Sequence, residues 1–359
     1  MRHAGGERAC GGRISNVVAG AGPAVTICGS GRIERLRGLQ LQVAVRDHLG
    51  RDVVGAPAAL GVGAGLIDDG RAWVLLDGVD HDPARGLGPA LAWALRRGAT
   101  ALDMIAPRAT GILARRAEAF AMPTAVWHLD DRTLLPAVAE PLPAPPDPSP
   151  AHLALMPMIE AGGARPVVEH GIVIGEVRGL EVCRVVDDAA TGIVRLDVGV
   201  GAHDREAFAL MHGDLPTIDA LRRVVGAVEQ HRRPDGRAHP LHRLVPERLV
   251  RWQLEQEPAR IGLVSLDSSE PPVPRATVKE RAPCTAAGRR ADGTPVVVVC
   301  SVGVDLDLLP YVTDARLAAG RRARAPEALV VLPARDLVPV TTELAGLLRQ
   351  PVVLVPLDA

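Results

Sequence analysis

The chain has 359 residues, of which 47% are hydrophobic and 23% charged, with a formal net charge of -1 at pH 7. These values are typical of globular proteins and exclude wholesale disorder, and the near-neutral charge gives no general attraction to nucleic acid or anionic lipid. A chain of this length predicts two or three domains with separate cores.

The cysteines and the apolar runs bear on the compartment of the protein. The five cysteines lie far apart and include no C-x-x-C pair, which excludes a disulfide framework and a zinc ribbon. The apolar residues 17–28 are broken by Gly20, Gly22 and Pro23, unlike a signal peptide. No uninterrupted apolar run reaches the roughly 18 to 20 residues of a membrane span. We therefore expect a cytoplasmic protein with no membrane partner.

The first 140 residues predict a tail and one α/β unit. Residues 1–35 are rich in Gly and Arg with little periodicity, and we expect a flexible tail there. Residues 36–140 form the predicted N-terminal unit, which opens with a helix over 36–49 and two strands, 64–68 and 73–77, around the turn Asp69-Gly70. Next come a helix over 87–97 that ends at Gly98, a strand over 101–106, a helix over 111–121 and a strand over 124–129.

A proline-rich segment separates this unit from the rest. Residues 141–150 read PLPAPPDPSP and predict an extended linker. Residues 151–290 predict a central α+β domain, with a helix over 151–161, strands within 167–186 and 192–199, and helices over 204–230 and 247–255. Residues 291–359 predict a C-terminal α/β unit, with strands at 296–300, 328–332 and 352–355 and helices at 308–319 and 340–348.

The two end units resemble each other in sequence order and spacing. The segment ALDMIAPR begins at Ala101, 22 residues before Pro123, and the segment ALVVLPAR begins at Ala328, 23 residues before Pro351. A D-x-D pair precedes each alanine. This agreement indicates an internal duplication. We therefore predict an α/β fold in which two related β-α-β-α-β units flank the central domain and pack around a pseudo-twofold axis.

The D-x-D pairs are candidate metal ligands. Each pair follows a strand, at the carboxyl end where open parallel sheets bind ligands. Carboxylates at i and i+2 of an extended segment point to the same side and can share Mg²⁺. The competing interpretation is that these aspartates cap the following helix or are solvated. The candidate ligands are Asp80, Asp82, Asp305 and Asp307.

The predicted order of strands and helices, with acidic residues near the first strand, resembles half of the restriction-endonuclease-like nucleases in topology only. This resemblance implies a carboxylate followed by Glu-x-Lys on the neighbouring strand. The corresponding strands here read WVLLD at 73–77 and VVVVC at 296–300, and neither contains a lysine. The resemblance therefore implies two inactive copies.

The central domain holds the densest polar chemistry. Imidazoles titrate near neutrality and carboxylates complete a metal's coordination, so such clusters can bind a divalent metal or act as general acids and bases. The competing interpretation is a solvated face. The candidate catalytic residues are Glu169, Glu181 and Asp197, and the candidate metal ligands are His203 and Asp204. The arginine-rich stretch 222–251 is either a phosphate-binding patch or is paired with acidic residues of its own domain.

Two functions from different classes follow. The first is a non-catalytic binding or regulatory protein built on degenerate copies of an enzyme-like α/β unit, with a protein partner or a second copy of itself as candidate partners. The alternative is a metal-dependent hydrolase or phosphoryl-handling, nuclease-like enzyme with its site in the central domain and a divalent metal as cofactor. The net charge does not indicate nucleic acid as a partner.

Overall fold

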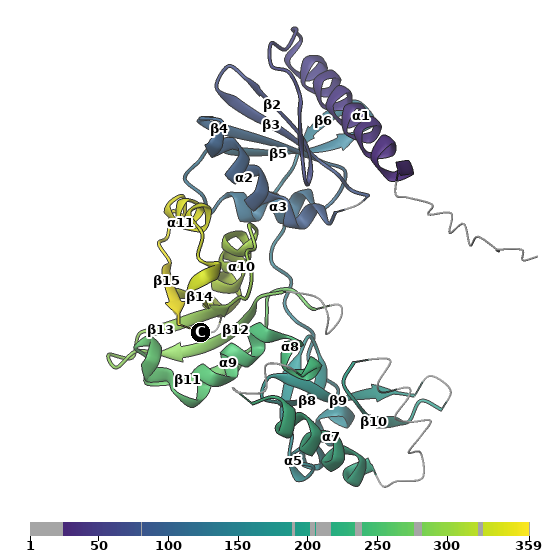
Figure 1. Cartoon of the computed structure of the whole chain (residues 1–359), viewed down its shortest axis with the longest axis vertical. Helices are drawn as coiled ribbons and strands as arrows, with labels where there is room; N and C mark the ends of the chain where they lie inside the picture. Colours follow the sequence, from purple (N-terminus) through teal and green to yellow (C-terminus); the bar gives the residue numbers. More distant parts are fainter. Residues whose placement is uncertain are drawn as a thin grey trace, which may run out of the picture.

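A computed structural model shows a mixed α/β protein with three sheets (Figure 1). It describes residues 24–79, 81–188, 191–201, 205, 217–233, 239–275, 282–321 and 326–358, with side chains from residue 31 onward. Within these ranges no helix combines the length and apolar character needed to cross a membrane. We predicted a flexible tail over residues 1–35. Residues 24–35 instead belong to helix α1 (Ala24–Leu49), and the rest of the predicted tail lies outside the described residues.

The N-terminal sheet has six strands in sequence order. Strands β3, β4 and β5 are parallel, and the other neighbours are antiparallel. The strands are β1 (Ala58–Leu60), β2 (Gly63–Asp68), β3 (Arg71–Leu76), β4 (Ala101–Ala106), β5 (Thr124–Asp130) and β6 (Thr133–Pro136). Helix α1 covers one face, and η1 (Pro83–Arg85), α2 (Leu87–Arg96) and α3 (Thr110–Ala117) lie on the other. Successive residues of a strand point to opposite faces of the sheet. Trp73 therefore packs with α1, whereas Val74 packs with the helices on the other face.

The C-terminal sheet has five strands, of which β13, β14 and β15 are parallel. Its elements are β11 (Ser265–Ser269), β12 (Cys284–Arg289), β13 (Pro295–Cys300), α10 (Leu308–Gly320), β14 (Glu327–Pro333), η3 (Ala334–Asp336), α11 (Pro339–Gly346) and β15 (Val353–Leu357). Strands β11 and β12, which we expected in the central domain, pair antiparallel with each other and with β13. A turn at Asp292-Gly293 joins β12 to β13, so the sheet extends across the predicted boundary at residue 290.

The central domain is an antiparallel sheet covered by helices on one face. Its strands lie in the order β10-β9-β8-β7, and Ile159, Val182 and Leu221 are among its buried residues. Its elements are α4 (Pro150–Leu153), α5 (Met156–Ala161), β7 (Arg165–Glu169), β8 (Ile172–Val177), β9 (Leu180–Asp187), β10 (Val194–Val198), α7 (Thr217–His231) and α8 (Pro240–Arg243). Of the helix expected over 204–230, the described residues include Arg205 and helix α7.

The two end units share one hydrophobic core. Helices α2 and α3 of the N-terminal unit pack against α10 and α11 of the C-terminal unit, between the two sheets (Figure 1). Leu91 and Met104 from one unit and Val312 and Val330 from the other belong to this core, and all four are buried. The end units therefore form a single body although the linker and central domain, about 130 residues between β6 and β11, separate them in sequence.

Helix α9 (Pro246–Gln256) joins the central domain to this body. Leu254 packs into the core of the C-terminal sheet. On the side toward the central sheet, buried Glu176 of β8 accepts hydrogen bonds from Arg248 and Arg251, both at 2.5 Å. Part of the arginine-rich stretch is therefore paired internally. Such a pair is costly to break, because one partner alone leaves a buried charge uncompensated.

Candidate ligand site at the junction of the end units

The first D-x-D pair lies beside η1. The Asp82 carboxylate caps η1 by accepting a hydrogen bond from the backbone N–H of Ala84 at 3.1 Å. Asp80 lies outside the described residues. The Asp82 geometry matches the helix-capping interpretation of this motif.

The second D-x-D pair connects the two end units. Asp305 accepts hydrogen bonds from Arg85 at 2.7 Å and from the backbone N–H of Asp307 at 3.0 Å. Asp307 accepts from the backbone N–H of Gly88 at 3.1 Å and from Arg116 at 3.2 Å. Burial raises the pKa of Asp307 to about 7, against the opposing effect of Arg116. Both carboxylates therefore meet groups of the N-terminal unit.

The candidate residues of the central domain have separate arginine partners. Glu169 pairs with Arg248 at 2.6 Å. Asp197 of β10 pairs with Arg195 at 2.8 Å. Glu181 accepts from Arg184 and Arg205, each at 2.9 Å.

These residues do not make up a recognisable metal centre in the described ranges. His203 and Asp204 lie outside those ranges. Among the residues that are described, no three His, Cys, Asp or Glu side chains gather in a way that would hold a metal ion. What the structure shows of Glu169, Glu181 and Asp197 is ion pairing with arginine, which neutralises each carboxylate.

A buried charge cluster lies between α3 and α10. Asp314 of α10 is fully buried and accepts hydrogen bonds from two consecutive arginines of α3. Arg115 donates at 3.0 and 3.2 Å, and Arg116 donates at 2.7 Å. Because Arg116 also reaches Asp307, two arginines face two carboxyl groups, and the cluster is balanced in charge when both carboxyl groups are ionised.

Next to this cluster the backbones of the two units meet in a reciprocal contact. The N–H of Ala121 donates to the carbonyl of Leu347 at 2.7 Å, and the N–H of Arg349 donates to the carbonyl of Ala119 at 2.9 Å. Phe120 and Leu348 face each other across this isolated antiparallel bridge. The bridge fixes the end of α3 against the chain that follows α11.

A cavity of about 540 Å³ opens beside the bridge. Four arginines and a single acidic residue line it, and the remaining lining is small, apolar or neutral. The lining comprises Arg115, Glu118, Ala119, Thr313, Arg316, Leu317, Gly320, Arg321, Leu348, Arg349 and Gln350. Its walls come from both end units, since Glu118 follows α3 and Arg316 lies on α10.

Arg316 is held by carbonyl groups instead of a carboxylate. Its two terminal nitrogens donate to the carbonyls of Gln350 at 3.0 Å and Pro351 at 2.7 Å. Its Nε is buried and has no hydrogen-bond partner. Burial lowers the pKa of Arg316, because a charged guanidinium is less stable away from water. The side chain is thus fixed in place while its charge lacks a counterion in the described part of the chain.

Two further arginines of the lining are held in the same way. Arg349 donates to the carbonyl of Glu118 at 3.2 Å, and Arg321 donates to the linker carbonyls of Leu142 and, at 3.1 Å, Pro143. In the described ranges neither of them, nor Arg316, forms an ion pair with a carboxylate. Carbonyl dipoles offset only part of a full charge, so the cavity carries a positive potential.

The chemistry of the lining suits binding of an anion. Guanidinium groups present rigid sets of N–H donors that match the oxygens of phosphate and carboxylate groups. The hydroxyl of Thr313 donates to the carbonyl of Pro310 at 2.7 Å within α10. Among the lining residues, Glu118 supplies the only carboxylate.

Comparison of the chain with models of protein families, with curated proteins and with solved structures finds no match.

Proposed function

We propose that this chain is a non-catalytic binding protein in which two degenerate α/β units form one body and hold a small phosphate-bearing molecule at their junction. The cavity volume of about 540 Å³ falls within the roughly 300 to 1,000 Å³ usual for small-molecule sites. Its lining combines fixed cationic donors with apolar side chains, which would orient such a ligand.

The observation that carries this proposal is the environment of Arg316. Arg316 is partly buried and its Nε has no hydrogen-bond partner, and partial removal of a guanidinium from water without a counterion is unfavourable. An anionic oxygen placed in the cavity would supply the missing charge, and Arg349 and Arg321 line the same space. The arginines of the α3–α10 cluster are already neutralised by Asp314 and Asp307, which separates their structural role from this one.

The proposed duplication is supported by the layout of the end units. In each, an antiparallel pair precedes three parallel strands, and a helix follows each of the first two parallel strands. Ala121 and Arg349, which donate the reciprocal hydrogen bonds, each lie two residues before a proline, Pro123 or Pro351. Equivalent groups that contact each other reciprocally are what a twofold arrangement of two copies requires.

The register of the two copies differs from the alignment of Ala101 with Ala328. In that alignment Leu102 corresponds to Leu329, but Leu102 packs in the core between the units and Leu329 in the core beneath α9. A shift of one residue exchanges the faces of a strand. On this basis we align Leu102 with Ala328, which packs in the shared core.

We describe the copies as degenerate because their strands lack a residue that catalysis would need. Neither β3 nor β13 carries a lysine, which the nuclease-like arrangement would need for catalysis. Asp307, a candidate metal ligand, is engaged by Arg116 and by the N–H of Gly88. In our proposal the catalytic groups of an ancestral unit have been replaced by groups that join the two copies.

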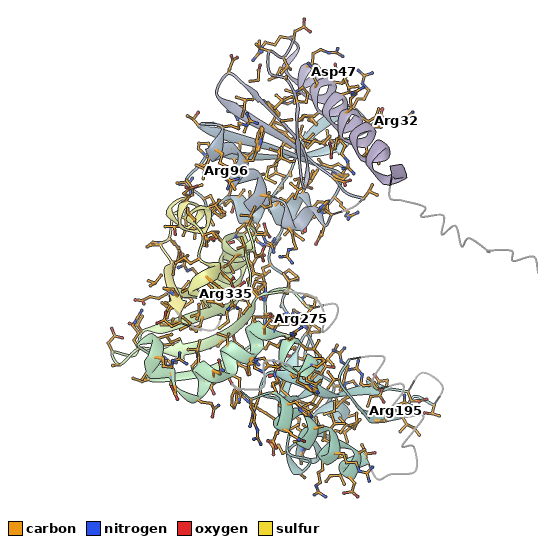
Figure 2. The ribbon with its side chains drawn as sticks, viewed as in Figure 1. Arg32, Asp47, Arg96, Arg195, Arg275 and Arg335 are labelled. Carbon is orange, nitrogen blue, oxygen red and sulfur yellow. The ribbon has the colours of Figure 1, made fainter. Side chains whose placement is uncertain are left out.

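Isothermal titration with pyrophosphate tests the proposed site. We expect binding to the wild type, and at least a tenfold weaker affinity for Arg316→Gln, which removes the charge and leaves a shorter polar side chain. Arg96→Gln is the control, because Arg96 is an exposed arginine of α2 (Figure 2) and does not line the cavity. Absence of heat with the wild type at millimolar pyrophosphate, or equal weakening in both variants, would contradict the proposal.

The alternative of a metal-dependent enzyme stays a prediction for the central domain. It requires ligands from residues that include His203 and Asp204. Elemental analysis together with thermal melts before and after EDTA tests it, since a metal bound to the native state adds stability. A stoichiometric metal and a lower melting temperature in EDTA would favour the enzyme over the binding protein.

A further inference from the structure

A second cavity, of about 360 Å³, lies on the other side of α10, above the C-terminal sheet. It is separate from the cavity beside Arg316 at the junction of the end units, although Arg321 lines both. The sheet forms its floor, α10 forms one wall, and the proline-rich linker and a Pro-Pro turn after β11 form the rest.

The floor and the wall of this cavity include many small side chains, alongside the charged Asp267 of β11 and Arg289 of β12. Alternate residues of β11 and β12 face α10, and they include Ser269, Thr285 and Ala287. The wall of α10 presents Ala315 and Ala318 to the same space. Because these serine, threonine and alanine side chains are small, a gap remains between the helix and the two outer strands.

The N-terminal unit fills the corresponding space. There, Trp93 of α2 lies over β2: a Cβ built on Gly65 would come within 2.8 Å of the Trp93 ring and 2.9 Å of the Leu60 side chain. The indole therefore rests on the bare backbone of Gly65, between α2 and the outer strands. No room for a ligand remains at that point, since even a methyl group would clash.

Ala315 lies near the position of Trp93 in the C-terminal unit. Trp93 is the seventh residue of α2 (Leu87–Arg96), and Ala315 is the eighth residue of α10 (Leu308–Gly320). Both side chains point toward the outer antiparallel strands of their own sheet. The same arrangement of helix and strands is thus filled by an indole in one unit and left open in the other. We call the open cavity beside Ala315 the slot.

The slot has a roof and a polar end. Pro143 and Pro145 of the linker cover it, and Arg321 holds this segment by bonding to the Pro143 carbonyl. His170, in the turn between β7 and β8, reaches the slot, and its Nε2 is buried without a hydrogen-bond partner. This polar end favours a ligand that carries one polar edge.

We propose that this slot binds a planar aromatic heterocycle of about the size of indole, stacked on the small residues of β11 and β12 with its ring nitrogen toward His170. Flat rings bury much apolar area between a sheet and a helix, and a polar group at one edge fixes their orientation. This proposal does not rest on the phosphate site.

Ligand-observed saturation-transfer NMR with indole as the probe tests the slot. We expect transfer to indole from the wild type, and at least a tenfold loss of affinity in Ala315→Phe, whose ring fills the slot as Trp93 does in the other unit. Ala151→Phe adds the same ring to an exposed position of α4 and should leave binding unchanged. Ala318→Phe, from the next turn of α10, should repeat the loss.

Thermal melts keep the test decisive. A filled slot should leave the melting temperature of Ala315→Phe at or above that of the wild type, so lost binding with an intact melt supports the proposal. Absence of transfer from the wild type at millimolar indole overturns it. Equal binding by wild type and Ala315→Phe, where the variant melts normally, also overturns it, because indole then sits elsewhere.

Discussion

The two end units differ mainly in what fills the space between a helix and the outer strands of its sheet. In the N-terminal unit Trp93 and Leu60 fill that space over Gly65, and β6 covers the edge of β5. In the C-terminal unit Ala315 leaves a cavity. This comparison teaches that one scaffold can serve packing in one place and binding in another, according to the size of a few side chains.

The largest effect we expect comes from breaking the charge cluster that both units share. Asp314→Ala leaves Arg115 and Arg116 without their common carboxylate. Loss of one partner of a buried ion pair costs about 3–5 kcal/mol, which urea unfolding would show. The exposed pair of Asp219 with Arg222 is the control, and Asp219→Ala should cost less than about 1 kcal/mol. Similar costs for the two variants would mean that the junction is not a buried cluster.

A second test uses the pH dependence of the junction. The pKa of Asp307 is raised from 3.8 to about 7, so between these values the folded state binds more protons than the unfolded state. Stability is then largest at acidic pH within this window and falls as pH rises toward 7, by at most roughly 1.4 kcal/mol per pH unit. Urea unfolding at pH 5 and pH 7 should show this loss in the wild type and a smaller one in Asp307→Asn. An identical pH dependence in both proteins would exclude the role given to Asp307.

A third test removes the side chain that fills the space over Gly65 in the N-terminal unit. Trp93→Ala removes the indole above Gly65 and leaves the N-terminal unit with a slot like that beside Ala315. Burial of Trp93 is incomplete, so we expect a cost of about 2–3 kcal/mol, below the 3–5 kcal/mol of a fully buried ring. Urea unfolding measures the loss of stability. Trp252→Ala, which removes a tryptophan of α9, is the reference variant for loss of a tryptophan outside the two end units. A cost near zero would show that Trp93 does not fill its unit as described.

Local patterns predicted many of the helices and strands. The helix over 87–97, the strand over 101–106 and the hairpin at Asp69-Gly70 agree with the structure, because periodicity and turn residues act within a few positions. Sequence could not show that β11 and β12 join the C-terminal sheet, since pairing with β13 depends on long-range packing. The Asp292-Gly293 turn was the available signal for the second of these pairings.

The candidate site was much less predictable than the fold. Sequence reasoning followed the acidic residues, and Asp305 and Asp307 do lie at the junction, but with arginines and backbone N–H groups as their partners. Arg316, Arg321 and Arg349 are three among the 41 basic residues of the chain, and no spacing distinguishes them. Their lack of carboxylate partners depends on the tertiary structure and is not visible in the sequence.

Crystals grown with tungstate, a heavy analogue of phosphate, test the central claim most directly. We predict an anomalous peak in the junction cavity, within hydrogen-bonding distance of the Arg316 guanidinium and close to Arg349. Tungstate bound only at other arginines, with this cavity empty at saturating concentration, would contradict the proposal that the two end units hold an anionic ligand between them.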